Sequence, residues 1–293
     1  MMGFFHIEDI LKLALKKNRR KIVVAGKNNS FAVDAALQSR KMGFGDPIFC
    51  GKEFSGLKTK ENILFDDSDA TQALCKAIGM VQDGDADIVL NTNPLTPDFL
   101  ELAAGTNRSN SRVMNYINIF SSPKEQRLTF FTDTLVNSNP EILKKIGIIH
   151  NSIPVADVLG IKNPNIAALA PVEFVNPAIG STMDAAILSK MSQRGQFGKS
   201  VVEGPLAMDN AESAIAAKQK GVDSIVPGNV DIYLFPDVES ANITAQFLSF
   251  VFQVKFCGIL TGTRIPVIIQ SSLEQNDSWI YNIALAVSML KGR

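Results

Sequence analysis

The stretch IAALAPVEFVNPAIGSTMDAAILSKMSQRGQFGKSVVEG (166–204) contains one complete unit of a recognisable fold class. Its first run, Ile166–Ala170, is apolar without alternation, which is typical of a strand buried on both faces. Ser181 can cap a helix over Thr182–Met191, and a second short strand is predicted at Ser200–Gly204. Because a strand, a helix and a second strand in this order form a parallel βαβ unit, the stretch predicts an α/β fold.

The same alternation continues in both directions along the chain. Further strands are predicted at Lys21–Gly26, Asp46–Gly51, Ile63–Asp66, Asp87–Asn91, Val113–Phe120, Leu128–Asp133, Ser224–Val226, Ile232–Pro236, Gly258–Leu260 and Pro266–Gln270. Further helices are predicted over residues 7–17, from a cap at Ser68 or Asp69 to Val81, from Pro140 through Ile153, after Asp209 or Asn210, and over Trp279–Lys291. Alternation over the whole length favours mainly parallel sheets flanked by helices.

The length permits more than one domain. With 293 residues, of which 46% are hydrophobic, the chain can form one large or two moderate cores. The segment Ser121–Gln126 is interpreted as a crossing between two sheets. The predicted division is a first α/β lobe of residues 1–121 plus 263–293 and a second α/β lobe of residues 122–262.

Composition excludes several classes of protein. The 29 Lys and Arg balance 29 Asp and Glu, so the sequence predicts no nucleic-acid partner. No apolar run reaches the roughly 18–20 residues that span a bilayer, so no membrane partner is expected. The cluster Lys16–Lys21 is interpreted as cations at a helix C-terminus rather than as a site for an anionic partner. Three distant cysteines and the absence of a secretory signal pattern predict a reduced, cytoplasmic protein.

Several common catalytic motifs are missing from the sequence. There is no GxGxxG, no GxxxxGK[ST] and no GxSxG, which removes the main support for a dinucleotide oxidoreductase, an NTPase or an α/β-hydrolase. Only two histidines occur, His6 and His150, so no His-rich zinc site is expected. From the residues alone, the chain is an α/β protein without an assigned reaction.

Six segments, in order and in register, resemble the phosphate acetyl/butyryl transferase family, and its butyryl branch more than its acetyl branch. They are GDADIVLNTNPLT (84–96), FTDTLVNSNP (131–140), APVEFVNPAIGSTMDAA (170–186), VVEGPLAMDNA (201–211), KGVDSIVPGNVDIYLFPDVESANI (220–243) and GILTGTRIPVIIQSS (258–272). The resemblance covers roughly residues 60–293 and is strongest over residues 165–270.

The resemblance implies a phosphate acyltransferase. Such an enzyme exchanges a short or branched acyl group, here butyryl-like, between coenzyme A and inorganic phosphate without a metal ion. The family implies two α/β lobes with the active site in the cleft between them, a homodimer, and coenzyme A as a substrate rather than a bound cofactor. The chemistry demands donors for phosphate oxygens, a base for the thiol and preplaced donors for the oxyanion.

The resemblance also suggests site residues. Ser271 matches the serine of the family's C-terminal Ser-Arg pair and is predicted to orient the reacting group. Asp277, or alternatively Glu274, is predicted to take the thiol proton, although Asn276, Asp277 or Ser278 is also needed to cap the last helix. The predicted substrate-binding residues are Thr96, Asp133, Asn137, Glu203, Glu239, Asn242, Arg264 and Ser272, and no metal ligands are predicted.

The sequence departs from the family pattern where cations are expected. The position of the arginine in the family's Ser-Arg pair is occupied by Ser272, and the position of a lysine at the end of the Asp87–Leu90 strand is occupied by Asn91. Arg264, Arg112 or Arg194 could supply a replacement guanidinium. These changes suggest an alternative function: a catalytically degenerate relative that binds coenzyme A or acyl phosphate in a regulatory or structural role. Phe247, Phe250, Phe252 and Phe256 are predicted to pack in the core rather than to form an acyl pocket.

Overall fold

The computed structural model describes residues 6–55, 57, 63–64, 69–104, 113–122 and 127–290. The chain divides into two compact units, which we call the first unit (Ile7–Arg112 and Lys255–Arg293) and the second unit (Val113–Val254). The divisions predicted from sequence, after residues 121 and 262, fall later in the chain. They differ because β5 (Asn115–Ser121) pairs with β6 (Leu128–Thr132) inside the second unit, while β10 (Phe256–Thr261) packs against α10 (Ser278–Met289) inside the first.

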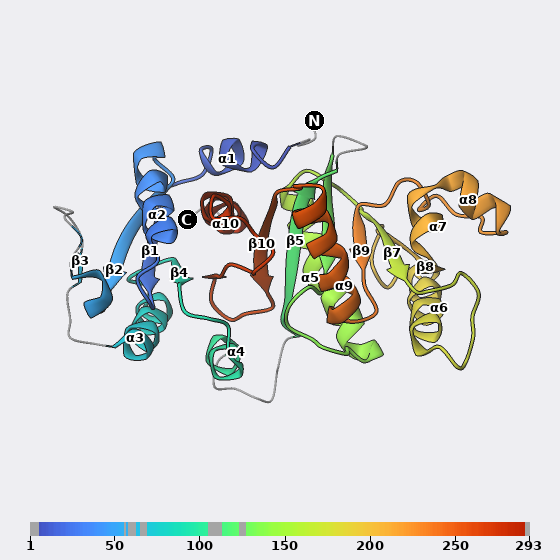
Figure 1. Ribbon diagram of the computed structural model, residues 1–293, viewed down its shortest axis with the longest axis horizontal. Helices are drawn as coiled ribbons and strands as arrows, with labels where there is room; N and C mark the ends of the chain where they lie inside the picture. Colours follow the sequence, from blue (N-terminus) through green and yellow to red (C-terminus); the bar gives the residue numbers. More distant parts are fainter. Residues whose placement is uncertain are drawn as a thin grey trace. The chain divides into compact units, whose positions relative to one another are not determined.

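The first unit is built on a parallel sheet. Its strands lie in the order β11-β4-β1-β2-β3, and every described pair is parallel (Figure 1). The strands are β1 (Arg20–Ala25), β2 (Gly45–Cys50), β3 (Ile63–Leu64), β4 (Ile88–Asn91) and β11 (Val267–Ile268). Four residues of β1, from Ile22 to Ala25, are fully buried, as expected of a strand covered on both faces.

Helices with clear termini flank this sheet. They are α1 (Asp9–Ala14), α2 (Ser30–Met42), the short 3₁₀ turn η1 (Lys52–Phe54), α3 (Ala70–Asp83), α4 (Pro97–Ala104) and α10. The predicted cap at Asp69 is confirmed, because its carboxylate accepts from the N–H groups of Thr71 and Gln72 while the Gln72 side chain accepts from the Asp69 N–H. Helix α10 packs against both α1 and α2.

The second unit, which runs from green to orange in Figure 1, carries a mostly parallel sheet in the order β5-β6-β9-β7-β8. Only the β5–β6 pair among the described ones is antiparallel. The remaining strands are β7 (Asn165–Leu169), β8 (Val201–Leu206) and β9 (Ile232–Leu234). An aromatic cluster anchors the core, because the Phe131 ring meets those of Phe120, Tyr233 and Phe235 edge-on at centroid distances of 4.9–5.4 Å.

Most strands of the second unit are joined by helices. These are α5 (Ile142–Val158), α6 (Gly180–Gln193), α7 (Met208–Glu212), α8 (Ala214–Gln219), α9 (Val238–Gln246) and a π-helical turn, η3 (Phe247–Val251). The chain passes from β6 to β7 and β8 and then returns to form β9, which lies between β6 and β7. Such a reversal leaves room for a ligand beyond the carboxyl ends of the strands.

Three local predictions were wrong. Ser224–Val226 is a turn rather than a strand, because the Ser224 hydroxyl accepts from the Val226 N–H. Ser181 lies inside the first turn of α6, whose N-cap is Ile179, and Ala207 rather than Asp209 or Asn210 precedes α7. Predictions at Asp66, Ser68, Lys291 and residues 123–126 lie outside the described residues.

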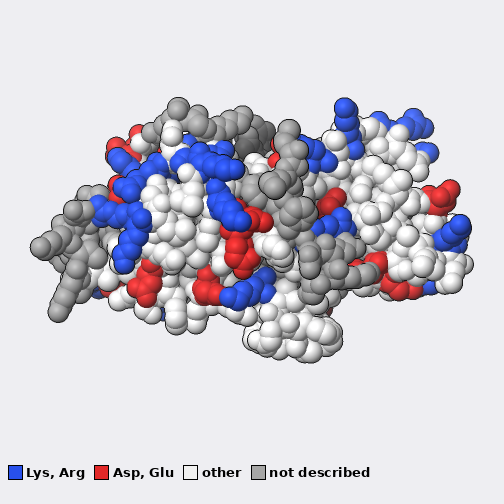
Figure 2. Space-filling model, turned by 90° about the horizontal axis from the view of Figure 1, so that it is seen from above, with Lys and Arg blue, Asp and Glu red and all other residues white. Residues whose placement is uncertain are grey.

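The basic cluster near α1 and α2 surrounds helix C-termini. Figure 2 shows lysine and arginine side chains gathered over this region. Lys16, Arg19 and Lys21 are exposed, and the Arg19 guanidinium donates to the carbonyl of Arg40 in the last turn of α2 at 3.1 Å. This contact agrees with the interpretation that the cations interact with helix C-terminal carbonyls.

Candidate functional site

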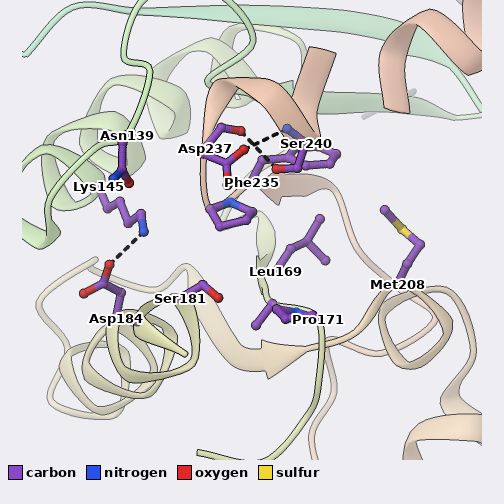
Figure 3. Close-up of a pocket in the computed structure, with 13 residues that line it drawn as sticks. Asn139, Lys145, Leu169, Pro171, Ser181, Asp184, Met208, Phe235, Asp237 and Ser240 are labelled. Atoms are coloured by element: carbon purple, nitrogen blue, oxygen red, sulfur yellow. Dashed lines mark hydrogen bonds and ion pairs between the residues drawn. The ribbon is translucent and has the colours of Figure 1, made fainter. Parts of the chain in front are cut away.

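A cavity of about 630 Å³ lies beyond the carboxyl ends of β6, β7 and β9, where the strand order reverses (Figure 3). Asn139 and Lys145 reach it from the segment after β6, and Leu169 to Pro171 from the end of β7. The start of α6, Met208 and the segment from Phe235 to Ser240 complete the lining. The cavity therefore occupies the position at which α/β sheets commonly bind ligands.

A buried ion pair forms one wall of the cavity. Lys145 lies in the first turns of α5, and its ammonium contacts Asp184 of α6 at 2.7 Å. The Lys145 side chain is only 6% exposed, whereas that of Asp184 is 26% exposed. A buried ammonium needs a partner, and the Asp184 carboxylate is the partner of Lys145 at the edge of the cavity.

The N-terminus of α6 forms a second wall. The N-cap residue Ile179 cannot supply a side-chain acceptor, so the first N–H groups of this 14-residue helix receive no side-chain cap. Gly180 and Ser181, which begin the helix, both line the cavity, and the Ser181 side chain is half-buried. An open helix N-terminus with a hydroxyl beside it is suited to stabilising negative charge.

The opposite wall is partly polar and partly apolar. Asp237 caps α9 by accepting from the Ser240 N–H at 2.7 Å, so that its carboxylate already has a partner. Leu169 and Phe235 are buried, and Met208 is 38% exposed; all three line the cavity. These apolar side chains give the cavity a surface on which a short hydrocarbon chain can be buried.

The balance of charge limits what the cavity can hold. Among the described residues that line it, the charged ones are one cation, Lys145, and two carboxylates, Asp184 and Asp237. A resident dianion would meet both carboxylates at short range, which is unfavourable. A neutral group that becomes negative only during reaction suits this lining better, because its oxyanion would gain donors from α6 and Lys145 as charge develops.

A surface ion-pair network joins the segment after β7 to helix α7 and to the C-terminal end of α8. The Lys220 ammonium lies 3.3 Å from Glu173 and 2.8 Å from Asp209. The hydrogen bond from Lys220 lowers the pKa of Asp209, while the pKa of Glu173 is lowered first by a backbone N–H bond and then by Lys220. Pairing with Asp209 in turn raises the pKa of Lys220.

Two predicted substrate-binding residues, Asp133 and Asn137, lie together in a buried turn after β6. The Asp133 carboxylate accepts from the N–H groups of Tyr116, Leu135, Val136 and Asn137 and from the Asn137 side chain. Burial raises the pKa of this carboxyl, and the hydrogen bonds oppose that shift. Both side chains support the turn.

Three further predicted residues of the second unit are not among those that line the cavity. Glu203 of β8 accepts from the Ser189 hydroxyl and the Gly204 N–H. Asn242 of α9 donates to the carbonyl of Thr134, and Glu239 is exposed in the first turn of the same helix.

In the first unit, the structure brings together Ser271 and Glu274. The Ser271 hydroxyl donates to Glu274 at 3.3 Å, and the Asn282 side chain donates to the other carboxylate oxygen at 2.7 Å. Both predicted residues are buried, at 4% and 8% exposure. Cys257 is fully buried, and burial raises the pKa of its thiol well above the usual value, with the Glu274 charge adding to the shift.

The other predicted residues of the first unit are exposed. Asp277 occupies the N-cap position of α10 but makes no capping bond; its carboxylate pairs with Lys255 at 2.6 Å. Thr96 accepts from the Phe99 N–H at the start of α4. Ser272 and Arg264 are exposed, as is Arg194 at the end of α6, whereas Arg112 lies outside the described residues.

The sequence analysis missed the residues that line the cavity. Ser181, Asp184, Asp237 and Ser240 all fall inside the motifs that carried the resemblance, so the motifs themselves contained the signal. Lys145 falls in a predicted helix and had no signal of its own. Within the described part of the chain, no group of three or more His, Cys, Asp or Glu side chains is arranged to hold a metal ion. No helix of that part is long and apolar enough to cross a membrane.

Comparison with known proteins gives consistent results. Residues 65–287 match the family described as phosphate acetyl/butaryl transferase. The chain is 35% identical over 288 residues to a phosphate butyryltransferase of Clostridium acetobutylicum, covering 95% of the chain and 96% of that relative. It is 29% identical over 289 residues to a phosphate acetyltransferase of Thermotoga maritima, covering 96% and 98%. A branched-chain phosphotransacylase from Enterococcus faecalis V583 has a similar fold, with a TM-score of 0.77, 22% identity, and coverage of 92% and 98%.

Proposed function

Because the chain belongs to the phosphate acetyl/butyryl transferase family, we propose that it transfers a short or branched acyl group between coenzyme A and inorganic phosphate. The chain is thus an enzyme, an acyltransferase of the phosphate butyryltransferase type, and coenzyme A is its substrate rather than a bound cofactor. The relatives named as phosphate butyryltransferases and the branched-chain phosphotransacylase support a butyryl-like acyl group. The degenerate alternative receives no support from these relatives. The proposed reaction uses no metal ion.

The cavity of the second unit is the proposed site for the acyl end of the thioester. The acyl chain would lie against Leu169, Met208 and Phe235, where apolar surface is available. The thioester carbonyl would face the first turn of α6, with the Ser181 hydroxyl and the Lys145 ammonium beside it. The open N-terminus of α6 next to a buried lysine is the observation that carries this assignment, because both stabilise an oxyanion.

The residues predicted from the resemblance keep their proposed roles. Ser271 orients the reacting group, and its hydrogen bond to Glu274 fixes the hydroxyl. Glu274 and Asp277 both remain candidates for the base that takes the thiol proton; Glu274 is buried beside Ser271, and Asp277 is exposed beside Lys255. Thr96, Asp133, Asn137, Glu203, Glu239, Asn242, Arg264 and Ser272 remain proposed substrate-binding residues. The active-site cleft that the resemblance implies also remains a prediction.

The test compares two adjacent lysines. Release of the coenzyme A thiol is followed with acetyl-, butyryl- and isobutyryl-CoA in the presence of phosphate. We expect Lys145→Met to lower kcat by about 100-fold with little change in KM, because one oxyanion donor supplies an effect of that order in other enzymes. Lys144→Met, on the exposed face of the same helix, is the matched control and retains wild-type kinetics.

Two results would contradict the proposal at different levels. If the wild-type chain releases no thiol above the buffer rate from any of the three thioesters, the acyltransferase function is wrong. If the wild type is active and Lys145→Met keeps its kcat, the function stands and the placement of the oxyanion is wrong. Circular dichroism of each variant checks that the fold is retained.

We also propose that the protein is a homodimer and is cytoplasmic. An apolar patch on α9 and η3 supports self-association, because Ile243, Phe247, Phe250, Val251 and Phe252 are each 55–68% exposed. The prediction that four phenylalanines pack in the core was wrong for Phe247, Phe250 and Phe252, which are exposed, whereas Phe256 is buried. Light scattering of the wild type and of Phe250→Asp tests whether the patch holds two 31.8 kDa chains together. The three cysteines are free thiols, which fits a reducing compartment.

A further inference from the structure

Met208 lies at the apolar end of the cavity in the second unit. In Figure 3 it lies away from Lys145 and Asp184, on the far side of Leu169 and Pro171. The proposed position of the thioester carbonyl is beside the Lys145 ammonium, at the opposite end of the cavity. An acyl chain that points away from this ammonium therefore runs toward Met208.

The backbone that carries Met208 is held in place on both sides. Before it, the Ala170 N–H donates to the Leu206 carbonyl at 2.9 Å, which joins the ends of β7 and β8. After it, the Asp209 carboxylate lies 2.8 Å from the Lys220 ammonium, which also pairs with a carboxylate of the segment after β7. These contacts keep the start of α7, and with it Met208, beside the end of β7.

The other large apolar side chains of the lining are packed too tightly to make room for a longer chain. Leu169 and Phe235 are 7% and 3% exposed. The Phe235 ring also packs edge-on against Phe131, with 4.9 Å between the ring centroids, and close-packed side chains move only at a cost. Met208, by contrast, is 38% exposed and has an unbranched side chain with three rotatable bonds, so it adapts without disturbing the core.

We propose that Met208 determines which acyl-chain length the enzyme accepts. This inference rests on the proposed function, which places the acyl chain in this cavity. A butyryl group reaches Met208 and buries its last methylene groups there, an acetyl group ends before it, and a longer chain meets its side chain. Because each buried methylene group contributes about fourfold, the two extra methylene groups of butyryl give a preference of about 15-fold over acetyl.

The test compares kcat/KM for acetyl-, butyryl- and hexanoyl-CoA in the thiol-release assay. We expect Met208→Ala to raise the hexanoyl-to-butyryl ratio about tenfold, because the shorter side chain opens the end of the cavity. Met208→Phe should lower the butyryl-to-acetyl ratio about tenfold, because the ring occupies the space of the last methylene groups. A ratio measured on one preparation does not depend on the fraction of folded enzyme, so lower stability cannot imitate either shift.

Met183→Ala is a control of matched exposure. Met183 of α6 is 38% exposed, like Met208, but it is not among the residues that line the cavity. Both ratios should keep their wild-type values in this variant. Unchanged ratios in both Met208 variants, or the same shift in Met183→Ala as in Met208→Ala, overturn the inference.

Binding of thioethers separates this inference from the acyltransferase function. S-ethyl-, S-butyl- and S-hexyl-coenzyme A have no acyl group to transfer, and their affinities for the full chain are measured by calorimetry. We expect the wild type to bind the butyl thioether more tightly than the ethyl one, and Met208→Ala to raise the hexyl-to-butyl affinity ratio.

The combined outcomes decide the two proposals separately. If no thioester reacts but the thioether affinities change as expected, the role of Met208 stands and the acyltransferase function fails. If the wild type turns over but no ratio depends on the residue at position 208, the function stands and the inference fails. If no thioester reacts and thioether affinity does not depend on chain length, both fail.

Discussion

Replacing Asp184 by Asn tests the electrostatics of the cavity in the second unit. The substitution keeps the size of the side chain but removes the negative charge that lies 2.7 Å from the Lys145 ammonium. Breaking a fully buried pair in this way costs about 3–5 kcal/mol. Because the Asp184 side chain is 26% exposed and water can approach it, we expect about 2 kcal/mol here.

This loss is measurable by thermal unfolding. A change of about 2 kcal/mol corresponds to a melting temperature lower by about 4–8 °C for a domain of 150–250 residues. The unpaired ammonium would then be free to bind an anion from solution. We therefore expect high phosphate concentrations to recover more stability for Asp184→Asn than for the wild type, because phosphate no longer competes with the carboxylate.

Asp157→Asn is the matched control for this experiment. Asp157 pairs with Lys162, but both side chains are about half exposed, so its loss should change stability by less than about 1 kcal/mol. Phosphate should act on this variant as on the wild type. The reasoning is refuted if Asp184→Asn has the same melting temperature as the wild type. It is also refuted if phosphate raises the melting temperatures of Asp184→Asn and the wild type by the same amount.

Two further predictions concern charge. Ser272→Arg restores the guanidinium that the family resemblance predicts and should raise kcat/KM for butyryl-CoA about tenfold or more; an unchanged value in the thiol-release assay would show that this position no longer faces the reacting group. Lys220→Met should lower the melting temperature slightly near pH 7, because Lys220 lowers the pKa of Asp209 in the folded state below its ordinary 3.8. This stabilisation is fully present above pH 3.8 and is lost as the pH falls from there through the lower pKa of the folded state. The difference between the two melting curves should therefore close at acid pH, and a gap that widens on acidification would contradict the assignment.

The fold was largely predictable because local sequence determines buried strands. The unbroken runs at β1, β4, β6 and β7 are apolar on both faces, and such runs have few alternative structures. The sheet order was not predictable, because β9 pairs between β6 and β7 through contacts distant in sequence. Helix N-caps were predictable only where a side chain accepts the capping hydrogen bonds. Asp69 caps α3 in this way, but the N-cap of α6 is Ile179, whose side chain makes no such bond.

The site was less predictable than the fold. Lys145 and Asp184 are 39 positions apart and meet only because α5 and α6 begin at the same edge of the sheet. In contrast, Asp133 and Asn137 carry the polar side chains that a motif search selects, yet they satisfy backbone donors and acceptors inside a turn. Residue type and spacing therefore identify polar groups without deciding whether they support the backbone or face a ligand.

The position of Asn91 bears on how the chain can supply positive charge for a polyanion when it has fewer cations than the family resemblance predicts. Asn91 stands where the family pattern has a lysine, is 1% exposed, and exchanges hydrogen bonds with the backbone of Asn93. It lines a cavity of the first unit together with Lys27, which supplies positive charge from the end of the neighbouring strand β1. Because a polyanion responds to the summed potential of a cavity more than to any single position, a lysine moved across one strand spacing of about 5 Å can preserve binding. On this argument, we predict that Lys27, which follows β1, compensates for the lysine missing at the end of β4, so that the loss of a motif residue is weak evidence for loss of activity.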